Sequence, residues 1–212
     1  MDFWARLEDI RARNNVLEHT FYQRWSKGEL TRGELAVYAG EYHHAVVALA
    51  DASARAARSA GDPQVESELA EHAVEEAAHV ELWAEFAAAV GGTPSARPAA
   101  ETSACAAAWA GNDDRDLLNT LVGLYAIESG QPAISATKHE GLTAFYDIED
   151  GPGTAYFTLH AKLDHEHAAA ERALIQTRLA GADEDELLAT AETVLRANWE
   201  LLDGVERLNG RA

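Results

Sequence analysis

Residues 154–176 read TAYFTLHAKLDHEHAAAERALIQ and contain the strongest local signal in the sequence. Its residues have the pattern of a helix, which we expect to run from about Thr154 to Ala180. At about 100° per residue, His160, Asp164 and His167 project from one stripe of that helix over two turns. The spacing suits a metal site. A solvated face or a hydrogen-bonded core cluster can produce the same trio, so both interpretations stay open.

Helical patterns fill the rest of the chain and are interrupted by short turn signals. Thr31 and Glu34 have capping-box spacing and begin a long helix towards Ala60. Asp62-Pro63 begins the next, which ends at Gly91-Gly92. Further helices are expected over 2–17, 21–27, 102–110 and 183–209, and from Asp113 or Asp114 to His139, with 140–153 as the clearest interruption. The sequence predicts one all-α domain, a bundle of about seven helices.

The composition narrows the class of protein. Lys and Arg number 17 against 36 Asp and Glu, which gives a net charge of −19 and makes nucleic-acid binding improbable. No apolar run is long enough to span a membrane, and none after Met1 resembles a signal peptide. Cys105 is the single cysteine, so no intramolecular disulfide can form. A cytoplasmic protein is expected.

A second signal for metal binding is Glu76-Ala77-Ala78-His79. Glu and His at this spacing stand one turn apart and form the Glu-x-x-His element of carboxylate-bridged two-metal bundles. Glu75 competes with Glu76, because it lies four residues before His79. His72, two turns before His79, is a further candidate ligand, but it is expected at the surface. In so acidic a helix this motif alone is weak.

Glu128 gives the third signal, because it ends a run without other charges from Leu121 onwards. A carboxylate in apolar surroundings needs a partner, since an unpaired buried charge is costly. A metal ion would supply that partner, and the alternative is a salt bridge to Lys138 or to an arginine.

Together the signals place carboxylates and imidazoles on three helices that a bundle can bring face to face. Such ligands suit iron or manganese, and no thiolate accompanies them. These possible ligands outnumber the four that one tetrahedral zinc ion would use. The proposed metal ligands are Glu76, His79, Glu128, His160, Asp164 and His167, with Glu75 as the alternative to Glu76.

Several segments resemble one known family. These are EHTFYQRWSKGELT at 18–31, HVELW at 79–83, YAIESGQP at 125–132, and Tyr156-Phe157 leading into the His160 triplet. From about Asn15 to Ile175, the chain resembles the TenA/PqqC-like proteins of haem-oxygenase fold. Within them it is most similar to the chlamydial-type di-metal oxidases that form 4-aminobenzoate.

The resemblance implies a haem-oxygenase-like bundle in which the six positions bind two iron ions, or an iron–manganese pair. The co-substrates would be O2 and an external reductant. The chlamydial-type proteins carry extra residues between the first glutamate and the histidine of the Glu76 helix. That departure leaves Glu75 and Glu76 as alternatives. A homodimer is also implied, with no nucleic-acid or membrane partner.

The resemblance further implies a reaction. Chlamydial-type proteins make 4-aminobenzoate for folate from a tyrosine of their own chain, with a lysine as amino donor. Tyr22 matches that tyrosine and Lys138 that lysine, while Tyr38 and Tyr156 fall on other tyrosines of the family. From composition alone, Tyr22 would be a core aromatic residue and Lys138 would pair with a carboxylate at a helix end.

Other functions remain as alternatives. A di-iron oxidase acting on an external small molecule would use the same ligands. A TenA-type thiamin-salvage hydrolase needs a cysteine nucleophile, but Cys105 precedes the Glu128 helix where that nucleophile is expected. A metal-free, PqqC-like oxidase would share the fold. A non-catalytic interaction protein would need an exposed apolar stripe, and the sequence has no long one.

Overall fold

The computed structural model describes residues 2–94, 97–112 and 115–211. Over these residues the chain is all-α, as expected, with nine α-helices and one short 3-10 helix. No helix in the described ranges is long and apolar enough to cross a membrane. The helices are α1 (Phe3–Arg13), η1 (Val16–Glu18), α2 (Thr20–Trp25), α3 (Arg32–Arg58), α4 (Pro63–Val90), α5 (Ala100–Ala110), α6 (Leu117–Glu128), α7 (Gln131–Phe145), α8 (Pro152–Gln176) and α9 (Glu184–Leu208).

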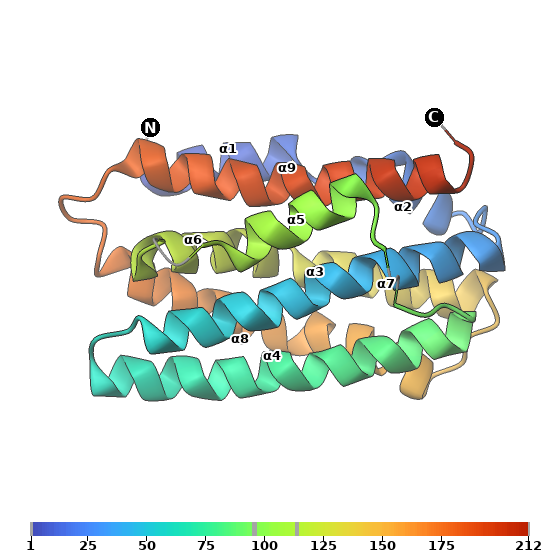
Figure 1. Cartoon of the computed structure of the whole chain (residues 1–212), viewed down its shortest axis with the longest axis horizontal. Coiled ribbons are helices and arrows are strands. Elements are labelled where there is room, and N and C mark those ends of the chain that lie inside the picture. The colour runs from blue at the N-terminus through green and yellow to red at the C-terminus, as the bar shows by residue number, and fades with distance from the viewer. Residues whose placement is uncertain (1, 95–96, 113–114, 212) are drawn as a thin grey trace.

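The long helices run side by side along the long axis of the molecule (Figure 1). Helices α3 and α4 form a hairpin, and α4 packs on α8 along its other side. Helix α6 contacts both α8 and α9, while α1 covers α9. This arrangement puts α4, α6 and α8 around one interior region, and these are the helices that carry the predicted metal ligands.

The predicted boundaries of α3 and α4 are confirmed. The Thr31 hydroxyl accepts a hydrogen bond from the Glu34 backbone N–H, and the Glu34 carboxylate accepts one from the Thr31 backbone N–H, which completes a capping box. Asp62 caps α4 with Pro63 in its first turn, and Gly91 ends that helix in the left-handed conformation. These caps fix where the α3–α4 hairpin turns.

The helix predicted to end at His139 differs from the structure. It is divided at Ser129-Gly130 into α6 and α7, because Pro132 lies in the first turn of α7, where its ring would clash with a continuing helix. The predicted caps Asp113 and Asp114 lie outside the described residues, and Asp116 caps α6.

The predicted interruption at 140–153 is shorter than expected, since α7 continues to Phe145. Gly141 lies inside α7, where a Cβ atom would come within 2.5 Å of the Trp25 indole. This glycine therefore permits close packing of α7 on α2 and does not end the helix.

Candidate metal centre

Helices α4 and α8 face each other with similar stripes of polar residues. On α4 the stripe is His72, Glu76 and His79, and on α8 it begins with His160, Asp164 and His167. The helices are antiparallel here, because His72 lies against His167 and His79 against His160, with ring centroids 4.2 and 4.4 Å apart. This arrangement creates two groups of possible ligands, which lie about two helical turns apart.

The first group contains Glu76, His79, His160 and Asp164, all of which are buried. His79 Nδ1 lies 2.9 Å from Glu76 Oε1 as an ion pair, without hydrogen-bond geometry. His160 Nδ1 lies 2.8 Å from Asp164 Oδ2, and Nε2 of His160 has no hydrogen-bond partner among the described residues. Two carboxylates and two imidazoles therefore converge from two helices.

The second group joins His72 and His167 to Glu128 of α6. Glu128 Oε2 is 3.3 Å from His72 Nε2 and 3.7 Å from His167 Nδ1. One ligand atom from each of the three residues lies within 4.8 Å of the others, which is close enough to surround one metal ion. His72 Nε2 is also 3.7 Å from Glu76 Oε1, so the two groups adjoin.

Glu75 does not point into the cluster. Its carboxylate is half exposed, and its Oε2 lies 2.9 Å from Nε2 of His167. A carboxylate on one ring nitrogen favours a proton there and leaves the other nitrogen free, as is common behind metal-binding histidines. Of the two alternatives, Glu76 is therefore the one inside the cluster, and Glu75 orients His167 from outside.

The electrostatics of the cluster reflect its burial and its crowding. Burial disfavours the protonated His72 imidazole, but the surrounding Glu128, Glu76 and Glu171 outweigh this and raise its pKa to about 11. Burial would raise the pKa of Glu76, yet contacts with His72 and His79 hold it well below its usual range. For Glu128, burial prevails and raises the pKa. Charges this closely packed need a compensating cation or shared protons.

Several buried ligand-type atoms have no hydrogen-bond partner among the described residues. Polar atoms of this kind are rare in native interiors and point to a missing ion or water. A mixture of carboxylate oxygens and imidazole nitrogens fits iron or manganese. The atoms are Nε2 of His72, Oε1 of Glu76, Nδ1 of His79, both oxygens of Glu128, Nε2 of His160, Nδ1 of His167 and both oxygens of Glu171.

Two expectations about this region are wrong. His72 was expected at the surface, but it is buried between α4, α6 and α8. Its position could have been inferred from the sequence, because His72, Glu76 and His79 have the same spacing as His160, Asp164 and His167. The alternative that Glu128 pairs with Lys138 also fails, since its neighbours are imidazoles. Glu171, one turn beyond His167, was missed.

Lys138 lies in an aromatic chamber beside the cluster. Its side chain is 0% exposed, and among the described residues its ammonium nitrogen has no hydrogen-bond partner. Burial lowers its pKa to about 7. The expectation of a carboxylate partner for Lys138 is therefore wrong. The ring centroids around Nζ lie at 5.3 Å for Tyr22, 5.5 Å for Tyr38, 4.8 Å for Tyr42, 5.6 Å for Trp83 and 5.5 Å for Phe157.

The chamber connects Tyr22 to the metal cluster. The phenol oxygens of Tyr22 and Tyr38 are 2.8 Å apart and hydrogen-bonded, and both side chains are buried. Tyr156 packs on His160 with ring centroids 4.1 Å apart, and on Trp83 at 4.9 Å. Burial raises the pKa of Tyr22, Tyr38 and Tyr156 well above the ordinary value, so these phenols keep their protons.

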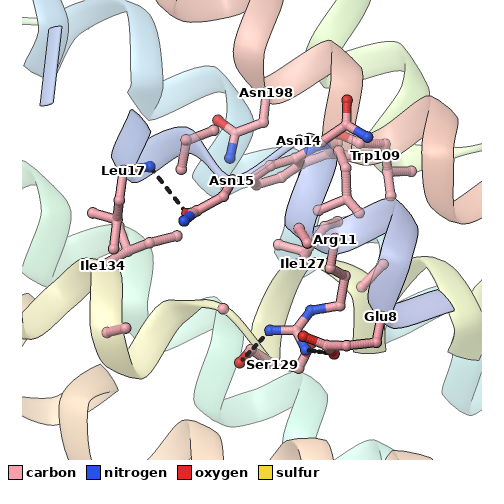
Figure 2. A pocket seen from close by; sticks show the side chains of 17 residues that line it. Glu8, Arg11, Asn14, Asn15, Leu17, Trp109, Ile127, Ser129, Ile134 and Asn198 are labelled. Carbon is pink, nitrogen blue, oxygen red and sulfur yellow. Dashed lines mark hydrogen bonds and ion pairs between the residues drawn. The ribbon is translucent and has the colours of Figure 1, made fainter. Parts of the chain in front are cut away.

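A separate cavity of about 310 Å³ opens between α1, η1, α9 and the α6–α7 junction (Figure 2). Arg11 lies on its wall, where it donates to the Ser129 carbonyl oxygen and pairs with Glu8. None of the predicted site residues lines this cavity. The predicted chemistry therefore belongs to the buried cluster and to the aromatic chamber.

Solved structures with the same fold include a domain with a heme oxygenase-like fold from Shewanella denitrificans. It has a TM-score of 0.79 at 19% identity and covers 99% of this chain and 94% of its own. A TenA homologue from Pseudomonas syringae pv. tomato also has a TM-score of 0.79, at 20% identity over 97% of this chain and 91% of its own. The haem-oxygenase-like fold is therefore confirmed.

The fold, together with a match of residues 36–199 to the family model of iron-containing redox enzymes, defines the class, and the chain belongs to this family. It is similar to the 4-aminobenzoate synthase of Chlamydia trachomatis serovar D, with 33% identity over 96% of this chain and 91% of that protein. The 4-aminobenzoate synthase of Nitrosomonas europaea is 30% identical over 96% of this chain and 90% of its own length.

Proposed function

We propose that this protein is an O2-dependent oxidase with a dinuclear iron centre, or an iron–manganese pair, that forms 4-aminobenzoate from its own Tyr22. Lys138 serves as the amino donor. The similar proteins named 4-aminobenzoate synthase support the product, and the family supports iron. The reaction consumes a side chain, so each chain completes one turnover at most.

One observation carries the proposal. The Lys138 amine, which has no hydrogen-bond partner among the described residues, lies 5.3 Å from the Tyr22 ring centroid in a fully buried aromatic chamber. That chamber adjoins the buried cluster of imidazoles and carboxylates through Tyr156. Placing an unpaired lysine in such surroundings costs stability, which suggests that the amine is there for its reactivity.

The roles of the residues follow from this geometry. When bound, the metal ions supply the redox chemistry that activates O2 with electrons from an external reductant. Tyr156 lies between the ligands and the chamber. Tyr38 orients the Tyr22 phenol through the hydrogen bond between the two hydroxyl groups. With a pKa of about 7, a large share of Lys138 is the neutral, nucleophilic amine at neutral pH.

Isotope labelling tests this function directly. Protein that carries ring-¹³C tyrosine and lysine labelled with ¹⁵N at the side-chain amine is given iron anaerobically. It is then exposed to O2 with a reductant. We expect 4-aminobenzoate that carries both labels, and a peptide containing Tyr22 that has lost mass. Tyr22→Phe should abolish the product, whereas Tyr125→Phe, a buried tyrosine bonded to Arg172 away from the chamber, should retain it. Unlabelled product with Tyr22 intact would favour an external substrate.

A thiamin-salvage hydrolase is disfavoured by the state of Cys105. This side chain is fully buried in α5, and burial raises the pKa of its thiol. A nucleophilic cysteine needs a lowered pKa and access to substrate. Neither condition holds for Cys105.

A further inference from the structure

Glu171 continues the polar stripe of α8 by one turn. His160, Asp164, His167 and Glu171 follow one another at spacings of four, three and four residues, so they share one face of the helix. This face is turned towards His72 and His79 of α4. Glu171 therefore lies next to the second group of ligands, beyond His167.

The carboxylate of Glu171 is buried without compensation. It is 2% exposed, and neither oxygen has a hydrogen-bond partner among the described residues. The adjacent Arg172 does not serve it, because that guanidinium packs on the Trp4 ring and donates to the Tyr125 hydroxyl. The charges that act on Glu171 most strongly are those of Glu128 and His72. An acidic side chain so placed stays neutral unless a cation binds its carboxylate.

We propose that Glu171 and His72 are ligands of the second metal ion, which is then bound by His72, Glu128, His167 and Glu171. This inference rests on the dinuclear centre proposed above and identifies two residues that the expected set of six ligands leaves out. The ion is a divalent cation of the iron or manganese type, since the donors are two imidazoles and two carboxylates.

The charge balance of the cluster supports this assignment. Its carboxylates are Glu76, Glu128, Asp164 and Glu171, and its imidazoles are neutral when they bind metal. Four negative charges balance two divalent cations. Without Glu171 the buried site would carry an excess positive charge, which a low-dielectric interior disfavours.

The three clustered residues leave room for a further ligand. His72, Glu128 and His167 already bring one ligand atom each within 4.8 Å of the others. Three protein ligands leave positions of an octahedral ion open, and a carboxylate one helical turn further along α8 can fill one of them.

The test is an anaerobic Fe(II) titration of the full chain, with Mössbauer spectroscopy of the bound iron. Wild type should bind two ions, each with its own quadrupole doublet. Glu171→Gln keeps the shape of the side chain but removes its charge, so it should weaken only the second ion. We expect the affinity for the second ion to fall by about 100-fold or more. Substitution of a residue outside the ligand sphere typically lowers metal affinity by about 10- to 100-fold. His72→Asn should weaken the same ion.

Glu166→Gln, an exposed glutamate on the same helix, is the matched control and should bind as wild type does. Glu171→Asp retains the carboxylate and should restore part of the affinity, and it replaces Glu171→Gln should that variant fail to fold. The proposal is overturned if Glu171→Gln binds two ions with the wild-type affinities and spectrum. A wild-type protein that binds fewer than two ions contradicts the dinuclear centre itself.

Discussion

At the level of single residues, Lys138 and Glu171 each lower the stability of the folded protein. One is a basic group and the other an acidic group, and both are buried without a hydrogen-bond partner among the described residues. They cannot neutralise each other, because Lys138 is surrounded by aromatic rings and Glu171 lies beside Glu128 and His72. Each therefore depends on chemistry outside the polypeptide, which in our proposals is a reaction and a metal ion.

Lys138→Met should stabilise the metal-free protein. Burial lowers the lysine pKa from 10.5 to about 7. Between these values the unfolded chain holds a proton that the folded chain has released, so stability rises with pH in this window. Below pH 7 the full penalty applies, on the order of 5 kcal/mol at 1.4 kcal/mol per pKa unit. Replacement by methionine should remove that penalty.

The measurement is the free energy of unfolding in urea for the wild type and for Lys138→Met at pH 6, 7, 8 and 9. The gain from Lys138→Met should be largest at pH 6 and 7 and should shrink towards pH 9. The phenols facing Lys138 do not interfere, because burial raises the pKa of Tyr22, Tyr38 and Tyr42 above that range. A gain that is constant with pH would mean that Lys138 is charged in the folded protein.

How far the sequence predicts single residues depends on which helix faces which. The spacing of His160, Asp164 and His167 selects one face of α8, and the structure buries that face against α4. The same spacing marks His72 on α4, whereas Glu171 lies one turn beyond the α8 triplet, and the sequence does not show how far along α8 the buried face extends. Their burial follows from the placement of α6 beside α8, a long-range contact that helical periodicity does not encode.

At the level of helices, the ends with strong local signals were predictable. Thr31, Asp62 and Gly91 act through bonds within a few residues, so sequence alone locates the limits of α3 and α4. The break between α6 and α7 has a weaker signal. Ser129 and Gly130 are compatible with a helix, and Pro132 either kinks a helix or begins a new one, so the sequence does not decide between these two outcomes.

Gly141→Ala tests the close packing between α7 and α2. Alanine normally favours a helix, but here its methyl group would lie 2.5 Å from the Trp25 indole. Trp25 donates a hydrogen bond to the Lys138 carbonyl and is fully buried, so it cannot move freely. We expect a loss of about 1–3 kcal/mol, measured by denaturant unfolding.

The matched control is Gly33→Ala, also inside a helix, where the nearest atom to the added methyl group is the Thr31 hydroxyl at 3.9 Å. That change should be neutral or slightly stabilising. Because Gly141 lies next to the lysine chamber, Gly141→Ala should also reduce 4-aminobenzoate formation. Equal stability of the two variants would contradict tight packing at Trp25.

At the scale of the whole molecule, the proposed metal centre joins parts of the chain that are far apart in sequence. Its ligands come from α4, α6 and α8, and the aromatic chamber adds α2, α3 and α7. An unpaired acidic cluster at this junction pushes the helices apart, whereas a bound cation draws them together. Metal binding should therefore act on the stability of the entire bundle.

Each ion at 100 times its Kd contributes about 2.7 kcal/mol, so two ions contribute about 5 kcal/mol. For a chain of this length that corresponds to a rise in Tm of about 10–20 °C, measured by anaerobic calorimetry with Fe(II) and with a chelator. Glu166→Gln should show the full rise, and Glu171→Gln about half of it. Because removing the Glu171 charge relieves repulsion, metal-free Glu171→Gln should melt no lower than the metal-free wild type. Equal melting temperatures of the wild type with metal and with chelator would show that the cluster binds no ion in the folded state.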